Sequence, residues 1–269
     1  MGFMYTSLSF IRHLLRAKRW DAFHSPWLFE LFTFCCDEKL TSPQFEKIEK
    51  RRKSLQTSDN VINRIDYGAG STAIASQRTT IGQIARNALS HPFQCRFLYR
   101  LANFHNPQHI LEFGTSLGIS TAYLSTGCVT TSIDTVEGDP QIAELAKQTF
   151  DAVGCHNISL CSMTFQEYID HYLSGKGLID IVFLDGHHTS RALLQYYQLL
   201  KHQFHPNTIL VVDDIYWSED MNNGWQELIH YPEVTQSVDC FHFGLVFFND
   251  EFIGRENHKI RLPVKMMLT

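Results

Sequence analysis

Between residues 109 and 249, short apolar segments alternate with amphipathic ones, and this alternation constrains the fold more than any other feature of the sequence. Five strand-like segments, each followed by a helical one, cover residues 109–113, 131–137, 158–162, 178–185 and 207–214. The helical segments are predicted at residues 116–125, 140–153, 164–173, 190–204 and 218–230. Strands that are apolar almost throughout and alternate with helices are typical of a parallel sheet covered on both faces.

Two further apolar segments, residues 234–241 and 243–249, close this part of the chain and are joined by a tight connection. Such a pair predicts an antiparallel hairpin at the end of the sheet. The pattern as a whole predicts an α/β fold with a Rossmann-like, seven-stranded, mostly parallel sheet and an antiparallel C-terminal hairpin. We expect this sheet domain to cover residues 106–269, and residues 1–105 to form an N-terminal helical cap with a lid loop.

The first predicted helix, over residues 7–19, is amphipathic. Its apolar residues share one face at spacings of three and four, and they are Leu8, Ile11, Leu14 and Leu15. Arginines lie off that face. Such a helix either packs on the chain's own core and leaves its basic side in water, or touches a membrane or an acidic partner.

The rest of the predicted cap is also helical, with one long polar interruption. Ser25 and Thr80 are expected to cap helices over residues 24–36 and 80–88, and a further helix is expected near residues 90–104. The charged run at 46–53 is expected at a solvated helix end. Residues 54–79 are rich in Ser, Thr, Asn and Gly, which predicts a long loop of the kind that often serves as a lid.

Composition excludes several classes of partner. The chain has 23 Lys and Arg against 28 Asp and Glu, a net charge of -5, and this argues against nucleic acid because phosphate neutralisation needs a basic surface. No apolar run approaches the roughly 20 residues that span a bilayer. The seven cysteines form no CxxC pair, so neither a zinc site nor a disulfide framework is expected, and we expect a reducing, cytoplasmic location. A homodimer is compatible with these features.

The first strand of the repeating pattern leads into a glycine-containing turn, Leu111 to Gly118. Gly114 allows a sharp bend and a close approach of the backbone to a ligand, and Gly118 allows a helix to pack closely. The N–H groups at the start of the next helix favour anionic or polar ligand groups. Open parallel sheets bind ligands beyond the carboxyl ends of their strands, so this turn is where a nucleotide-like ligand is expected.

The spacing of the turn differs from that of a dinucleotide site. Ser116 stands where the second glycine of G-x-G-x-x-G would admit a pyrophosphate. Glu137 follows the second strand, 19 residues beyond Gly118, where a carboxylate can accept both hydrogens of a ribose diol. The alternative interpretation is that Glu137 only complements the start of the next helix.

This combination resembles the class I S-adenosylmethionine-dependent methyltransferases over residues 109–248. In that family the motif represented here by Glu112, Gly114 and Gly118 surrounds the methionine part of S-adenosyl-L-methionine. The acid after the second strand, here Glu137, holds the ribose. The resemblance also assigns cofactor contacts to residues in and beside the same turns, namely Thr115, Ser116, Gly138, Ser162, Met163 and Asp185, with Ser162 and Met163 near the adenine. A second glycine-containing segment, residues 65–71, follows no apolar strand, and we interpret it as a loop element of the cap.

Acidic residues end the fourth and fifth predicted strands: Asp185 on one and Asp213 with Asp214 on the other. Clustered carboxylates suit Mg²⁺, which could bind a substrate hydroxyl and lower its pKa. The layout is similar to catechol O-methyltransferase-like and cephalosporin-biosynthesis-like enzymes, and this resemblance implies that the three carboxylates are metal ligands. Asp214 departs from the catechol enzymes, which have Asn there. The alternative is that Asp185 and Asp214 cap the helices that follow.

Two histidines follow Asp185 directly. His187 or His188 could be a general base because imidazole titrates near neutral pH, and we favour His187 together with Asp185 as the catalytic pair. Trp217 could line a substrate pocket, whereas Trp225 is expected to pack its helix on the sheet.

The sequence therefore predicts an S-adenosylmethionine-dependent methyltransferase that O-methylates a small molecule, with metal assistance left open. The alternatives are an NAD-dependent oxidoreductase on a Rossmann-like sheet and a noncatalytic interaction protein that keeps the methyltransferase fold.

Overall fold

The strands and helices predicted after residue 109 are present in the structure, a computed structural model that describes residues 2–66, 75–250, 252 and 254–263. The strands are β4 (His109–Phe113), β5 (Ser132–Glu137), β6 (Ile158–Ser162), β7 (Ile181–Leu184), β8 (Ile209–Asp213), β9 (Gln236–Asp239) and β10 (Phe243–Phe247). The helices are α6 (Ile119–Gly127), α7 (Pro140–Val153), α8 (Phe165–His171), α9 (Ser190–Leu200) and α10 (Glu219–Leu228). Continuous apolar runs for the strands and the 3.6-residue period for the helices were therefore sufficient to locate these elements.

The chain divides into two compact units, and the division does not fall at residue 105. We call residues 1–36 with 177–267 the first unit, and residues 37–176 the second unit. Residues 1–105 are thus shared between the two units and do not make a separate cap.

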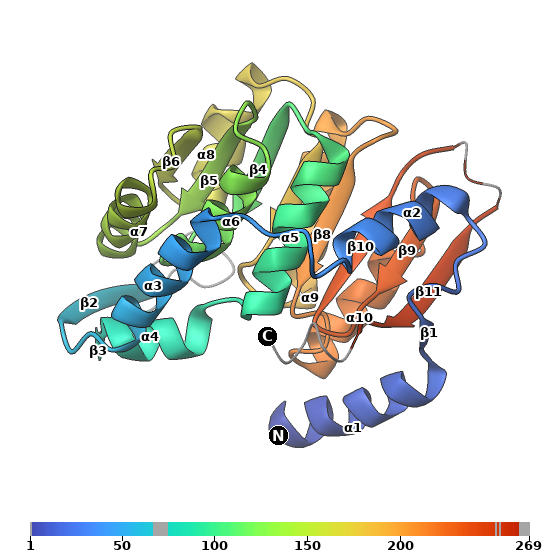
Figure 1. The fold of residues 1–269 in the computed structure, drawn as a ribbon, viewed down its shortest axis with the longest axis horizontal. Coiled ribbons are helices and arrows are strands. Elements are labelled where there is room, and N and C mark those ends of the chain that lie inside the picture. Colours follow the sequence, from blue (N-terminus) through green and yellow to red (C-terminus); the bar gives the residue numbers. More distant parts are fainter. Residues whose placement is uncertain (1, 67–74, 251, 253, 264–269) are drawn as a thin grey trace. The chain divides into compact units, whose positions relative to one another are not determined.

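The first unit contains the predicted antiparallel hairpin. β7 and β8 run parallel, and β10 is antiparallel to both β8 and β9. Two strands were not predicted: β11 (Glu256–Arg261) runs parallel to β9, and β1 (Lys18–Arg19) runs parallel to β11 (Figure 1). β1 has only two residues and β11 is mostly polar, so no apolar run marks either strand. Over the described residues of both units, β1 and β4–β11 number nine strands, where the sequence predicted seven.

Helix α1 (Gly2–Arg16) exists, but its apolar side does not face the core. Leu8, Ile11 and Leu15 are exposed, whereas His13 is buried. The Nε2 atom of His13 lies 3.0 Å from the Ile260 carbonyl oxygen on β11. A polar contact with the sheet therefore fixes this helix, and the prediction that Leu8, Ile11, Leu14 and Leu15 pack on the chain's own core is wrong. Helix α2 (Pro26–Cys35) begins as predicted after Ser25.

The second unit is built on three parallel strands in register. Phe113 on β4 pairs with Val136 on β5, and Glu137 on β5 pairs with Ser162 on β6. The carboxyl ends of the three strands therefore lie side by side. Three helices precede them: α3 (Gln44–Gln56), α4 (Ile81–Ala88) and α5 (Pro92–His105). Thr80 caps α4 as predicted, through a capping box with Gln83.

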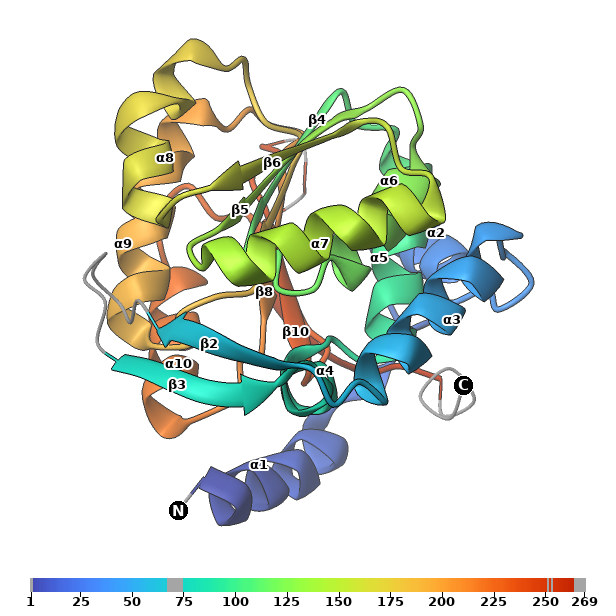
Figure 2. The ribbon, with the colours of Figure 1, turned by 90° about the vertical axis from the view of Figure 1, so that its left-hand side faces the viewer.

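Residues 54–79 are not a structureless loop. They contain β2 (Val61–Asp66) and β3 (Ala75–Thr80), which pair antiparallel and extend beside α7 (Figure 2). Backbone hydrogen bonds hold this hairpin without an apolar strand pattern, and the sequence therefore gave no signal for it. Residues 67–71 of the second glycine-containing segment lie outside the described residues.

The charged run at 46–53 is also only partly solvated. Arg52 is buried, and its guanidinium donates to Glu49, to the Ser90 carbonyl and to the Cys95 sulfur. A buried arginine requires several acceptors, and this one joins α3 to the start of α5.

All seven cysteines lie among the described residues, and no disulfide joins any two of them, as predicted. Within the described part of the chain, every helix is too short or too polar to cross a bilayer.

Candidate active site

The turn after β4 has the backbone geometry of a ligand-binding turn. Gly114 has φ 105°, Ser116 has φ 48° and Gly118 has φ 78°. Positive φ is costly for a residue with a side chain and is found mostly where the surroundings enforce it. Here the Val136 carbonyl enforces it in part by accepting hydrogen bonds from the N–H groups of Gly114 and Thr115, at 3.1 and 3.3 Å. The turn is thereby tied to β5.

Glu112 supports this turn from inside the protein. Its carboxylate is fully buried and accepts hydrogen bonds from the hydroxyls of Ser120 at 2.7 Å, Thr135 at 2.6 Å and Thr121. Burial raises the pKa of Glu112, and the three hydroxyls act against that rise. Glu112 therefore joins β4 to α6 and β5, and its effect on a ligand would be exerted through the turn that it positions.

Glu137 lies directly beside the turn. Its Oε2 atom accepts a hydrogen bond from the Ser116 N–H at 2.9 Å, and its Oε1 atom accepts one from the Asp139 N–H at 3.0 Å. Burial raises the pKa of Glu137 to about 7, although both N–H donors and Arg64 oppose the rise. The alternative role at a helix start is not the one observed, because Asp139 caps α7 by accepting from the Gln141 N–H at 2.8 Å.

The remaining residues predicted at the cofactor site have two different settings. Thr115 is buried and its hydroxyl lies 2.6 Å from that of Thr135, so it faces the interior. Ser162 is exposed at the end of β6, in register with Glu137, and Met163 follows it with partial exposure. Ser162 and Met163 are thus brought to the same strand edge as Glu137.

Gly118 allows helices α6 and α7 to pack closely. A Cβ atom placed there would lie 2.6 Å from Cε1 of Phe150 on α7 and 3.3 Å from Cα of Ala146. Real Cβ atoms do not approach that closely, so only glycine lets α6 begin against α7.

The hairpin β2–β3 lies within the segment predicted as a lid loop, but its two strands were not predicted. The Ile65 N–H donates to Asp139 Oδ2 at 2.6 Å, and Asn63 exchanges two hydrogen bonds of 3.3 Å with the Gln141 side chain. The hairpin is therefore fastened to the start of α7, two residues from Glu137. It is the feature of the second unit best placed to cover a ligand at that turn.

In the first unit, β7 and β8 end in the predicted carboxylates, but the three do not make one metal-binding set. Asp213 is buried on β8, and Asp214 has φ 54° with its N–H donating to the His242 carbonyl at 2.7 Å. Across the residues that the structure describes, no three His, Cys, Asp or Glu side chains are grouped so that they could hold a metal ion. Asp185 and Asp214 are also not helix caps, since Thr189 caps α9 and Ser218 caps α10.

The two histidines after Asp185 differ in their partners. His187 has φ 53°, and its Nδ1 atom lies 2.8 Å from the Tyr196 hydroxyl. His188 lies with the carboxylates instead: its Nε2 atom is 3.8 Å from Oδ1 of Asp185. Burial lowers the pKa of His188 and raises that of Asp214, while the attraction between the two acts against both shifts. The structure therefore favours His188 over His187 as a neutral base at pH 7.

The two tryptophans are as different as the sequence suggested. Trp217 is 59% exposed, and its ring centroid lies 5.9 Å from that of His188. Trp225 is fully buried, and a Cβ atom at Gly244 would lie 2.3 Å from its ring. Trp225 thus packs α10 on the sheet, as predicted, and Trp217 is the tryptophan available to a ligand.

Residues 111–215 match a family model described as a methyltransferase domain. The matched segment begins one residue before Glu112 and ends one residue after Asp214, so it contains every residue predicted at the cofactor, catalytic and metal sites. It covers well under half of the chain.

Two curated proteins are similar to this chain in sequence. The chain is 32% identical over 75 residues to a protein-L-isoaspartate O-methyltransferase of Syntrophotalea carbinolica, a match that covers 28% of this chain and 34% of that protein. It is 24% identical over 165 residues to a catechol O-methyltransferase of Niastella koreensis, over 60% of this chain and 73% of that protein. The chain thus spans only about a third of the first relative's length.

The fold is shared with solved methyltransferase structures. A methyltransferase from Podospora anserina with bound S-adenosylhomocysteine aligns with a TM-score of 0.60 and 16% identity, over 85% of this chain and 97% of that one. The Rossmann-like α/β fold predicted from the sequence is confirmed, as is the resemblance to class I S-adenosylmethionine-dependent O-methyltransferases.

Proposed function

We propose that the chain is an S-adenosylmethionine-dependent methyltransferase that O-methylates a small-molecule acceptor. The observation that carries the proposal is the contact between Glu137 and the Ser116 N–H, which sets a half-buried carboxylate against the glycine turn at one strand edge. The match of residues 111–215 to a methyltransferase domain supports the donor. The names of the two curated relatives, both O-methyltransferases, support oxygen as the acceptor atom.

The residues of the second unit fit this cofactor. Glu137 has a carboxylate that can accept both hydrogens of a ribose diol, and Gly114 and Ser116 present turn backbone beside it. Ser162 and Met163, at the end of β6, lie where an adenine would extend from that ribose. The cofactor, when bound, supplies an electrophilic methyl group on a sulfonium, so the chain itself has to hold the donor and position and deprotonate the acceptor.

We assign to His188 the role of general base, which accepts the proton of the acceptor hydroxyl. Its lowered pKa keeps the imidazole neutral at pH 7, so that it can accept a proton. Asp214 and Asp185 are the carboxylates that face it, and either stabilises the imidazolium that forms. The exposed ring of Trp217 beside His188 offers a flat apolar surface to an aromatic acceptor.

Metal assistance has no step in the proposal, because Asp185, Asp213 and Asp214 do not fit a divalent cation. Among the described residues, no group of three His, Cys, Asp or Glu side chains is arranged so that it could hold a metal ion.

The test is turnover of S-adenosylmethionine carrying a labelled methyl group with a panel of phenols, catechols and hydroxy acids, with and without EDTA. We expect label to appear as a methyl ether on at least one aromatic hydroxyl compound, at a rate that EDTA leaves unchanged. Label on nitrogen or carbon acceptors alone would contradict O-methylation. Binding of S-adenosylhomocysteine without turnover of any acceptor would instead support a noncatalytic protein.

A further inference from the structure

Helix α1 presents an apolar stripe to solvent. The exposed fractions are 48% for Leu8, 56% for Ile11, 37% for Leu14 and 82% for Leu15. Their spacing of three, four and seven residues places them on the side of the helix away from the buried His13. Isolated exposed leucines are ordinary, but four on one helix face form a patch of the kind that marks an interaction surface.

The border of this stripe is basic. Arg12 and Arg16 are exposed on α1, Lys18 follows on β1, and no Asp or Glu occurs in the sequence before Asp21. Among the described residues, no ion pair is found for Arg12, Arg16 or Lys18. The segment therefore carries a local positive charge on a chain whose net charge is -5.

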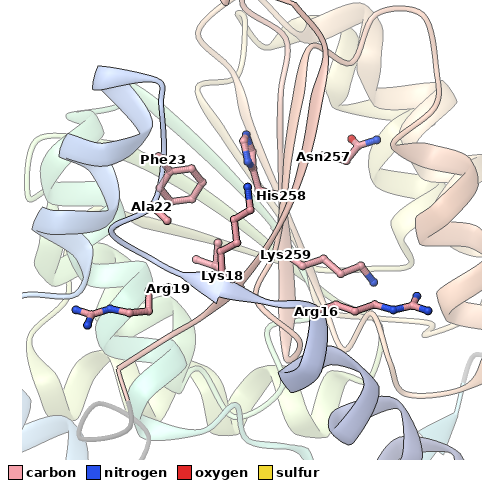
Figure 3. Close-up of a pocket in the computed structure, with 9 residues that line it drawn as sticks. Arg16, Lys18, Arg19, Ala22, Phe23, Asn257, His258 and Lys259 are labelled. Carbon is pink, nitrogen blue, oxygen red and sulfur yellow. The ribbon is translucent and has the colours of Figure 1, made fainter.

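A pocket of about 280 Å³ lies beside the C-terminal end of α1 and continues the basic border. Arg16, Lys18 and Arg19 line it together with Lys259 on β11, and Figure 3 shows Arg16 and Lys259 extending in the same direction. Arg19 is paired with Asp21 and Lys259 with Asp239. Arg16 and Lys18 are thus the cations of the pocket that remain available to an anion.

We propose that α1 docks this protein on an anionic lipid bilayer. Leu8, Ile11 and Leu15 enter the boundary between headgroups and acyl chains, and Arg12, Arg16 and Lys18 contact lipid phosphates from the border. Arg16 and Lys18 extend in different directions in Figure 3, and each contacts a headgroup phosphate of its own. Docking of this kind would place the enzyme where apolar methyl acceptors accumulate.

Charge decides between a membrane and a second copy of the chain. In a two-fold contact through α1, each Arg12 and Arg16 would meet basic residues of the same segment, because no carboxylate lies there. Like charges across an interface are unfavourable, whereas an anionic surface complements the border along its whole length.

The experiment is co-sedimentation of the full chain with vesicles of phosphatidylcholine, alone or mixed with phosphatidylserine. We expect binding to the mixed vesicles only, weakened by added salt as charge screening requires. Leu15→Ser should reduce the partition coefficient about tenfold, because it removes a buried leucine from the boundary. Arg16→Gln and Lys18→Gln should each reduce it about fivefold.

Matched controls keep the outcome interpretable. Val129 is 76% exposed in the second unit, and Lys147 is exposed on α7, so Val129→Ser and Lys147→Gln should bind as the unchanged chain does. All the substituted side chains are exposed, so the thermal midpoint of each variant should match that of the unchanged chain.

Three results would overturn the proposal. The first is equal binding to both vesicle types, or to neither. The second is loss of binding in Arg16→Gln and Lys18→Gln with none in Leu15→Ser, which would indicate a soluble polyanion. The third is a dimer in sedimentation equilibrium that Leu15→Ser dissociates, which would assign the stripe to self-association.

Discussion

The two units differ in how far their polar groups are already satisfied. In the second unit, three hydroxyls bond to Glu112, and the Gly114 and Thr115 N–H groups bond to Val136. At the ends of β7 and β8 in the first unit, burial instead lowers the pKa of His188 and raises the pKa of Asp214, and the attraction between the two groups opposes both shifts. In the proposed function, the turn after β4 in the second unit is already shaped for the cofactor, and His188 and Asp214 in the first unit are the groups whose ionisation changes during the reaction.

This contrast divides the expected effects of substitution. A preformed turn lowers the cost of binding, so changes in the second unit should appear in cofactor affinity. A proton acceptor acts in the chemical step, so changes at His188 should appear in turnover.

The largest effect is expected for His188→Gln. Loss of the base should lower kcat about 10² to 10⁴-fold and leave S-adenosylhomocysteine affinity unchanged. His187→Gln, which removes the ring paired with Tyr196, should cost about tenfold at most in kcat. Steady-state kinetics and calorimetry on both variants check this. Equal losses of kcat in the two variants would contradict the assignment of the base to His188.

Gly114→Val should come next. At φ 105° a branched side chain is strained by about 1–3 kcal/mol, and the turn that faces the ligand would be displaced, so cofactor affinity should fall about a hundredfold or more. Gly154→Val is the matched control: its φ is 85°, and among the described atoms none lies within 4 Å of a Cβ there. Gly154→Val should lower the denaturant midpoint, because the strain destabilises the fold, and should leave cofactor affinity unchanged.

Glu137→Gln should weaken cofactor binding and remove one pH dependence of stability. Removing the charged acceptor of a ribose diol should cost about tenfold to a hundredfold in affinity. The pKa of Glu137 in the folded chain, about 7, lies above its unfolded value. The free energy of unfolding therefore falls as pH rises from about 4.5 to about 7, and it stays lowered above that range. Because Gln has one side-chain oxygen for the N–H groups of Ser116 and Asp139, the variant should lose one of these hydrogen bonds, and its free energy of unfolding should no longer fall between about pH 4.5 and about pH 7.

Gln141→Ala probes the hairpin and should have the smallest effect. It removes two exposed hydrogen bonds of 3.3 Å between Asn63 and α7, so cofactor affinity should fall about two- to fivefold. Gln148→Ala, further along α7, is the control and should leave affinity unchanged. If both variants bind alike, the hairpin has no part in the site.

Apolar runs predicted the central strands well, because β4, β7, β8 and β10 are buried and almost wholly apolar. They could not find β11 or the hairpin β2–β3, since backbone pairing holds these polar segments. Apolar periodicity also misplaced Leu8 and Leu15, because the pattern of an amphipathic helix does not say whether the apolar side meets the chain or something else.

The site residues follow the same division. Strand-end position sufficed to bring Gly114, Glu137 and Ser162 to one edge, since parallel strands in register end together. Our preference for His188 over the adjacent His187 rests on side-chain contacts, and the grouping of the three carboxylates depends on the positions of their side chains. Neither is encoded in a local pattern.

The account depends most on Glu137 and its turn as the donor site. Calorimetric titration of the full chain with S-adenosylhomocysteine, at steps between about pH 6 and about pH 8, tests it most directly. The predicted result is one molecule per chain with an affinity that rises through about pH 7 as Glu137 ionises, a rise that Glu137→Gln abolishes. Absence of binding, or an affinity that stays constant across this range in the unchanged chain, would contradict it.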